Sequence, residues 1–276
     1  MFLPSLQGMM STAQRFIDFR DNRLCYSTAG SGLTPLLLFH GFGQSHRVFE
    51  EWEKALGKEY RLFAFDLFFH GQSEWPNRQT LEKSDWKKII ELFLDQEKIG
   101  RFALTGYSLG GKFALAVLEA FPEKVTTLYL IAPDGIKTSM WYSLATYPFV
   151  IRKLFKSLIL RPRRFYDTIR ILRSLGIVNK GILRFAESQM DSEEKRRRVY
   201  LSWVYFRHLK FDMKKIADIL NRHGIPLVMI VGKFDKVIPA ENMDRLMKRL
   251  DQKRLEVIDT GHNNLIKNAV GFLSNE

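Results

Sequence analysis

Short, continuous apolar runs recur along this chain, and most of them end at a glycine or an acidic residue. Such runs are typical of strands in a parallel sheet, because these strands are buried on both faces. Segments with the spacing of amphipathic helices separate the runs, which predicts βαβ units and a mostly parallel sheet of the α/β class. We expect strands within 35–40, 61–71, 102–111, 125–133, 225–235 and 254–263, and helices over 46–57, 80–98, 112–121 and 240–250.

The N-terminal part departs from this pattern. Residues 14–29 alternate apolar and polar side chains, which predicts a hairpin of edge strands that turns at Asp21 and Asn22. The single cysteine, Cys25, excludes an internal disulfide, and we expect it to be a small apolar packing residue in a reducing compartment. No basic n-region is present, and no apolar run approaches the ~18–20 residues of a membrane-spanning helix. We therefore expect no signal peptide and a cytoplasmic protein.

The alternation of strands and helices breaks between residues 136 and 212, where helical spacing dominates. A chain of 276 residues fits one domain that carries an insertion. We therefore expect an α/β core at 1–135 and 213–276 and an inserted helical cap at 136–212. The expected cap contains 17 Lys or Arg and 6 Asp or Glu, so +11 of the chain's net charge of +13 lies there.

The sequence Gly-Tyr-Ser-Leu-Gly-Gly at 106–111 lies between a buried apolar run and an amphipathic segment. This is the context of a nucleophile elbow, a tight turn from strand to helix that exposes a serine hydroxyl. The glycines allow a turn too tight for a side chain, and the amide dipoles of the following helix point at the same place. Ser108 is therefore the candidate nucleophile, and a simple packing turn is the alternative.

A serine hydroxyl is a weak nucleophile that needs a base, and the base needs an orienting acid. In the chain order that accompanies this elbow, the acid follows the serine and the histidine comes last. His262 follows the last expected strand, on a loop, and Asp235 follows the strand before it. We expect Asp235 to accept a hydrogen bond from one ring nitrogen of His262, while the other takes the Ser108 proton. Asp134, one strand earlier, is the alternative acid.

The sequence His-Gly-Phe-Gly at 40–43 follows the first long buried strand. Acyl transfer needs amide donors that are aimed at the developing oxyanion. This loop can supply the amide of Phe42, and the elbow can supply the amide of Leu109. We interpret His40 as a residue that braces the loop, with a role as base as the alternative.

A second His-Gly sequence lies within residues 66–73. Asp66, His70 and Ser73 are close in sequence and lack an elbow, so we interpret them as a set that braces a loop. No metal-ligand spacing and no phosphate-binding glycine loop is present in the sequence, and the expected chemistry needs no cofactor. Lys112, just past the elbow, is expected to be solvated, with contact to an acidic substrate group as the alternative.

Together these motifs resemble the α/β-hydrolase superfamily, in particular the branch with a helical cap inserted after the sixth strand. Five sequences fall where that family has a motif: HGFG (40–43), DLFFHGQS (66–73), GYSLGG (106–111), GKFDKVIP (232–239) and TGHNN (260–264). The resemblance covers roughly 14–135 and 213–273 but not the expected cap. It implies an eight-stranded, mostly parallel sheet flanked by helices.

The resemblance carries the nucleophile onto Ser108, the acid onto Asp235, the base onto His262 and the oxyanion donors onto Phe42 and Leu109. Phe68 and Phe69 depart from the family, which more often has proline or arginine and then glycine before this His-Gly. A serine at the elbow excludes the relatives that use an aspartate nucleophile. The resemblance implies a serine hydrolase of carboxylic esters or similar acyl bonds, and a fold alone does not choose the substrate.

Two other functions stay open at this point. One is a carbon–carbon bond hydrolase or lyase that uses the same triad on an anionic substrate. The other is a non-catalytic ligand-binding protein on the same fold, which an intact triad argues against.

The charge of the expected cap suggests a partner. Residues 149–160 predict a basic amphipathic helix, and basic clusters follow at 161–164 and 195–198. Such helices often lie on anionic membrane surfaces, so a peripheral membrane contact through the cap is one hypothesis. Attraction of an anionic substrate is a second, and a solvated basic face whose apolar residues pack on the core is a third. We expect no nucleic-acid partner, because no known binding module is present.

Overall fold

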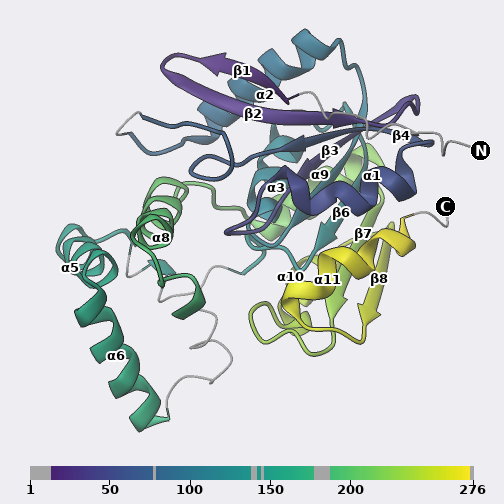
Figure 1. Cartoon of the computed structure of the whole chain (residues 1–276). Helices are drawn as coiled ribbons and strands as arrows, with labels where there is room; N and C mark the ends of the chain where they lie inside the picture. The colour runs from purple at the N-terminus through teal and green to yellow at the C-terminus, as the bar shows by residue number, and fades with distance from the viewer. Residues whose placement is uncertain (1–13, 77–78, 138–141, 144–145, 177–186, 274–276) are drawn as a thin grey trace, which may run out of the picture.

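An eight-stranded sheet runs through the protein (Figure 1), in the order β1-β2-β4-β3-β5-β6-β7-β8. The computed structural model describes residues 14–76, 79–137, 142–143, 146–176 and 187–273. The strands are β1 Gln14–Phe19, β2 Asn22–Ala29, β3 Thr34–Phe39, β4 Tyr60–Phe65, β5 Phe102–Tyr107, β6 Val125–Ile131, β7 Leu227–Gly232 and β8 Lys253–Ile258.

The sheet is mostly parallel, as expected. Strands β1 and β2 form an antiparallel hairpin, β2 pairs antiparallel with β4, and the remaining neighbours are parallel. The hairpin turns at Arg20 and Asp21, so Asn22 already belongs to β2. Of the two hairpin strands, β1 is an edge strand and β2 is not, because β2 has a neighbour on both sides. Cys25 is fully buried, which confirms its interpretation as a packing residue.

Helices cover both faces of the sheet (Figure 1). The helices α2 Lys83–Glu97, α3 Gly110–Ala120 and α9 Met213–His223 bury large side chains such as Trp86 and Phe113 against one face. On the other face, α1 Glu50–Leu56 and α11 His262–Ala269 bury Trp52 and Leu265. The family's eight-stranded sheet flanked by helices is therefore present.

The C-terminal elements differ from the expectation in detail. The expected helix 240–250 is a 3-10 turn, Ala240–Met243, followed by the one-turn helix α10 Asp244–Met247. Strand β8 is an edge strand with alternating exposure, and Leu255 and Val257 are about half exposed. The strand expected within 254–263 is therefore present, but it is not buried on both faces as the central strands are.

The described part of residues 136–212, which we call the helical segment, contains no strand and consists of helices joined by turns and irregular stretches. The helices include α5 Phe149–Leu160, α6 Pro162–Leu175 and α8 Glu193–Tyr205. Residues from all three form a small core of their own, separate from the two cores of the sheet: Ile159, Phe165, Ile169, Met190 and Val199. The division of the chain into core and cap stays a prediction. In the described ranges no helix is both long enough and apolar enough to cross a bilayer.

Candidate active site

Ser108 stands at the strained turn between β5 and α3. Its φ angle is +50°, in the left-handed region that residues with a side chain rarely adopt. The turn is closely packed, because a Cβ on Gly106 would lie 2.7 Å from the carbonyl oxygen of Gly110, and one on Gly110 would lie 2.0 Å from that of Phe39. The strand, the glycines and the helix thus force the Ser108 side chain outward, as the elbow motif predicts.

Ser108, His262 and Asp235 form one hydrogen-bonded line. Nδ1 of His262 lies 2.6 Å from Oδ2 of Asp235, and Nε2 lies 3.0 Å from Oγ of Ser108. Oδ1 of Asp235 accepts the amides of Val237 and Ile238 at 2.8 and 2.9 Å, which fixes the carboxylate. Because Nδ1 donates to this carboxylate, Nε2 is left to accept the serine hydroxyl proton.

The sheet order explains how residues so far apart in sequence meet. β5, β7 and β8 end on the same edge of the sheet, since all three run parallel. Ser108, Asp235 and His262 follow those three ends directly. His262 does not lie on a loop, as the sequence suggested, but is the first residue of α11, with Gly261 as the N-cap. The helix start holds its backbone more rigidly than a loop does.

Tyr107 is a site residue that the sequence did not single out. Its ring stacks on the His262 ring at a centroid distance of 5.4 Å, and its hydroxyl donates to the His262 carbonyl at 2.7 Å. Burial raises the pKa of Tyr107, so the phenol stays protonated and remains a donor. The sequence could have identified Tyr107, because this residue directly precedes Ser108 in the elbow motif and must therefore lie next to the site.

Asp134, the alternative acid, binds a different partner. It forms an ion pair with Lys112 at 2.9 Å, and its amide donates to the Ser108 carbonyl. The expectation that Lys112 is solvated is wrong, since the residue is only 4% exposed and its ammonium lies 4.4 Å from the centre of the Tyr142 ring. Burial alone would lower the pKa of Lys112, but Asp134 and Tyr142 together outweigh burial and raise it. Lys112 therefore joins the elbow to the helical segment.

The loop after β3 carries the candidate oxyanion donor Phe42. Within the described residues, the amides of Phe42 and Leu109 donate to no backbone or side-chain acceptor. The loop is braced by Gln44, whose Oε1 accepts the amide of Gly41 at 3.0 Å. The Phe42 ring packs edge-on against the ring of His70 at 5.4 Å. Both amides are thus available at the end of the sheet where Ser108 lies.

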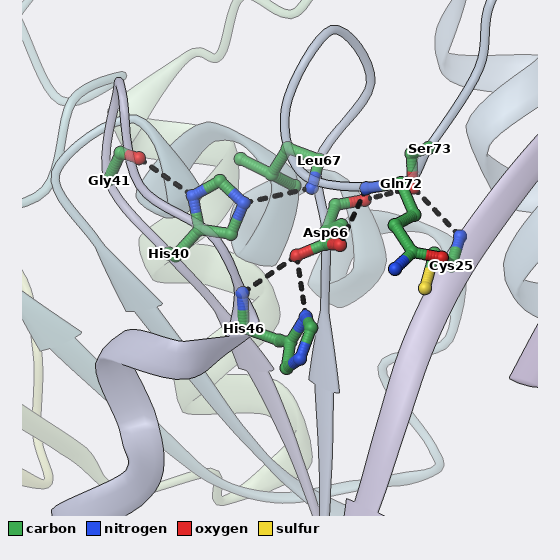
Figure 2. A network of polar contacts seen from close by, with 8 residues as sticks. All are labelled: Cys25, His40, Gly41, His46, Asp66, Leu67, Gln72 and Ser73. Carbon is green, nitrogen blue, oxygen red and sulfur yellow. Dashed lines mark hydrogen bonds and ion pairs between the residues drawn. The ribbon is translucent and has the colours of Figure 1, made fainter. Parts of the chain in front are cut away.

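The second His-Gly sequence forms a buried bracing network behind the site (Figure 2). The Asp66 carboxylate accepts the amide and Nδ1 of His46 at 2.7 and 2.9 Å and the amide of Gln72 at 2.9 Å. Burial would raise the pKa of Asp66, but these hydrogen bonds outweigh burial and lower it. The Ser73 hydroxyl donates to the Asp66 carbonyl and accepts the amide of Cys25. The network confirms the bracing role of Asp66 and Ser73 and adds His46, which the sequence analysis missed.

His40 braces its loop as expected (Figure 2). Its Nε2 accepts the amide of Leu67 at 3.0 Å, so Nδ1 carries the proton that is donated to the Gly41 carbonyl at 2.7 Å. Burial lowers the pKa of His40 to about 4. Burial, followed by the neighbouring His40, also lowers the pKa of His70, whose Nδ1 donates to the Phe68 carbonyl. Both rings are neutral at pH 7 and serve as fixed supports.

Phe69 connects this loop to the helical segment. It has a φ angle of +67°, where the family more often has glycine. Its ring packs against those of Tyr205 and Phe206 at 5.5 Å, and its carbonyl accepts a hydrogen bond from Arg198. In the described ranges no group of three or more His, Cys, Asp or Glu is placed to hold a metal ion.

Comparison with known proteins identifies the family of the fold. Residues 34–269 match the model of the family described as alpha/beta hydrolase fold. The chain belongs to this family. Its members share the sheet, and the chemistry of any one of them depends on the side chains at the strand ends.

Individual relatives of this α/β hydrolase are distant. A poly(3-hydroxyalkanoate) depolymerase of Ectopseudomonas oleovorans is 27% identical over 241 residues, which are 86% of this chain and 81% of the relative. A 2-hydroxy-6-oxo-6-(2'-aminophenyl)hexa-2,4-dienoic acid hydrolase of Metapseudomonas resinovorans is 21% identical over 272 residues, 94% and 88% of the two chains. The solved structure of a thermophilic esterase from Thermogutta terrifontis has a TM-score of 0.69 at 18% identity, covering 95% of this chain and 96% of that one.

Proposed function

We propose that this α/β hydrolase is a serine hydrolase that cleaves a carboxylic ester or a similar acyl bond. The observation that carries the proposal is the hydrogen-bonded line from Asp235 through His262 to Ser108, with distances of 2.6 and 3.0 Å. A serine at a strained turn, an imidazole within reach and a fixed carboxylate are the parts that acyl transfer through an acyl-enzyme requires.

In the proposed reaction, Oγ of Ser108 attacks the carbonyl carbon while Nε2 of His262 takes the serine proton. The amides of Phe42 and Leu109 stabilise the oxyanion. His262 then gives its proton to the leaving oxygen, and the ester bond breaks to leave an acyl-enzyme. A water molecule attacks this intermediate, His262 takes the water proton, and return of that proton to Ser108 frees the acid. Asp235 stabilises the imidazolium throughout.

The test is labelling with a fluorophosphonate probe together with hydrolysis of p-nitrophenyl esters of increasing chain length. Ser108→Ala is expected to abolish labelling and to lower kcat by about 10⁵-fold or more, while the exposed loop variant Ser31→Ala leaves both unchanged. Folded protein that is not labelled and hydrolyses no ester would contradict the proposal and favour a non-catalytic ligand-binding protein.

A carbon–carbon bond hydrolase or lyase is the second candidate. It is favoured by the similarity to a dienoic acid hydrolase and by the excess of basic residues in the helical segment. In this case Ser108 and His262 act mainly in proton transfer on an anionic substrate. Turnover of a conjugated keto-acid with none of simple esters would favour it over the ester hydrolase.

We further propose that the helical segment docks on an anionic lipid surface, where it would meet ester substrates. Five apolar side chains of α5 and α6 are more than half exposed: Phe149, Val150, Leu154, Ile171 and Leu175. Arg164 of α6 donates to Ser157 of α5 at 2.6 Å, so the two helices meet along this pair.

Helical spacing puts most of these side chains beside that contact. Val150 and Leu154 lie seven and three residues before Ser157, and Ile171 lies seven residues after Arg164, on the same helix faces. Basic residues interrupt the apolar surface on both helices. A surface with exposed apolar and basic side chains together fits the boundary between acyl chains and anionic headgroups.

Sedimentation with vesicles of phosphatidylglycerol and phosphatidylcholine tests this docking. Leu154→Ser is expected to weaken vesicle binding about tenfold, because a leucine side chain that leaves water contributes about 1.5–3 kcal/mol. The matched control is Leu33→Ser, which removes a fully exposed leucine between β2 and β3. Binding that is insensitive to salt, or equal weakening by both variants, would contradict the docking surface.

A further inference from the structure

A cavity lies away from the catalytic line. Its volume is about 510 Å³, and it opens where the helical segment meets the loop before α2. The residues that matter here are Thr80 and Glu82 from the loop, Arg152 from α5, Tyr200 and Tyr205 from α8, and Arg207. Ser108, His262 and Asp235 do not line it, so it is a separate place on the molecule.

Two guanidinium groups line this cavity, those of Arg152 and Arg207. Among the described residues, neither Arg152 nor Arg207 forms an ion pair with a carboxylate. Arg207 uses Nη1 to bind the carbonyl of Val204 at 2.6 Å, which leaves its other donors for a ligand. Burial, followed by the positive charge of Arg152, lowers the pKa of Arg207. Both residues line the cavity, and the positive charge of Arg152 disfavours the charged form of Arg207.

Tyr200 lies within the field of both arginines. Burial raises its pKa, whereas Arg152 and then Arg207 act in the opposite direction. Its phenol is thus a neutral group near both cations, on the same wall of the cavity. A phenolic O–H can add a hydrogen bond to an oxyanion that the two guanidinium groups hold.

Among the described residues that line the cavity, Glu82 is the one carboxylate, and it already has hydrogen-bond partners. Its side chain accepts hydrogen bonds from Thr80 and His208 and caps the first turn of α2. The negative charge of Glu82 acts to raise the pKa of Arg207. Burial and the charge of Arg152 have larger effects, so the pKa of Arg207 remains lowered. The cavity keeps an excess of positive charge that a bound anion would neutralise.

We propose that this cavity binds an organic phosphate or carboxylate whose oxyanion lies between Arg152 and Arg207. Guanidinium groups bind such oxyanions with paired hydrogen bonds, and two of them can share one anion. The volume exceeds that of a bare phosphate and is typical of sites for small organic molecules, about 300–1,000 Å³. The rings of Tyr200 and Tyr205 would contact the organic part. The loop and the helical segment both supply residues, so the ligand would hold them together.

Calorimetric titration with phenyl phosphate tests the proposal, in the Ser108→Ala background so that the catalytic serine plays no part. Arg152→Gln and Arg207→Gln are each expected to weaken binding at least about tenfold, since each removes charge-assisted hydrogen bonds. The matched control is Arg197→Gln, an exposed arginine of α8, which is expected to leave the affinity unchanged. Inorganic phosphate, which lacks the ring, is expected to bind more weakly than phenyl phosphate.

Three results would overturn the proposal: no binding of phenyl phosphate, binding unaffected by either arginine substitution, or an equal loss in the Arg197→Gln control. A circular-dichroism spectrum of each variant separates loss of binding from loss of fold. Because binding is measured without the nucleophile, it can succeed or fail independently of ester hydrolysis.

Discussion

Tyr107 supports His262 in two ways, through its ring and through its hydroxyl. The ring stacks on the imidazole, and the hydroxyl holds the backbone of the same residue. A base that must meet both a carboxylate and a serine tolerates little movement, because a small misplacement has large effects on rate. Tyr107 is therefore a positioning residue in the proposed reaction.

Tyr107→Phe keeps the ring and removes the hydroxyl. The lost hydrogen bond contributes about 1 kcal/mol, so we expect about a fivefold fall in kcat with a small change in KM. Steady-state hydrolysis of a p-nitrophenyl ester measures both. Tyr166→Phe, on the exposed side of α6, is the control, and equal rates for Tyr107→Phe and the wild type would rule out the positioning role.

His40 makes the stability of the fold depend on pH. In the unfolded chain a histidine binds a proton near pH 6.5, whereas burial lowers the pKa of His40 in the folded protein to about 4. Between these values the unfolded state binds more protons. The free energy of unfolding is therefore expected to fall as the pH falls from about 6.5 to 4, by up to about 3 kcal/mol from this residue.

Urea unfolding at a series of pH values measures this dependence. His40→Asn is expected to reduce the slope between pH 6.5 and 4, while His223→Gln, an exposed histidine of α9, leaves it unchanged. A slope that is the same in all three proteins would show that His40 is not the group responsible. The pKa of His70 is also lowered in the folded protein, so His70 accounts for part of the slope that remains in His40→Asn.

At the scale of elements, the sequence was most informative where burial is simplest. Central strands such as β3 and β5 are continuous apolar runs because helices cover both of their faces, and runs of this kind were recognised directly. Strand β8 and the start of α11 were less clear, since an edge strand and a short helix leave weak patterns. Lys112 could not be placed, because its burial depends on Asp134 and Tyr142, which only the folded chain brings to it.

The candidate site was predictable because its residues are tied to the ends of strands that the sequence reveals. Its three side chains follow strand ends in chain order, and parallel strands that are close in the sheet end on the same edge. His46 and Phe69 act through side-chain contacts with residues distant in the sequence, which no spacing along the chain records. The cavity at Arg152 and Arg207 was invisible for the same reason, since its walls come from separate elements.

The loop after β4 holds the helical segment through Phe69, at the expense of backbone strain. Phe69→Gly relieves a left-handed conformation worth about 1 kcal/mol but loses aromatic contacts worth more. We expect a net loss of about 1–3 kcal/mol in the free energy of unfolding. Lys98→Gly, at the exposed end of α2 with a φ angle of +55°, loses no such contact and is expected to be neutral or stabilising by up to about 1 kcal/mol. Chemical denaturation compares the two, and a stabilised Phe69→Gly would show that the ring is not an anchor.

Across the whole molecule, packing is uneven. Two extensive cores hold the sheet and its helices, whereas α5 and α6 share a small core of their own. Elements with few buried apolar contacts open at lower free energy than the rest of a protein. The helical segment is therefore the part most ready to open while the sheet stays folded.

Limited proteolysis followed by mass spectrometry tests this order. Both trypsin and chymotrypsin are expected to cut first between residues 149 and 175, where basic and apolar side chains are exposed together. The use of two proteases separates local opening from the mere abundance of arginine. First cuts within α2, which carries exposed lysines of its own at Lys87 and Lys88, would contradict the prediction.

The order of strands also determines when the site is completed during synthesis. The hairpin, the elbow and their helices leave the ribosome before β7 and β8, which carry Asp235 and His262 into the sheet. A nascent chain that has already made Ser108 lacks both the base and the acid. Any fragment released before residue 262 would carry the proposed nucleophile in an unactivated form, so activated serine would arise only in chains translated past His262.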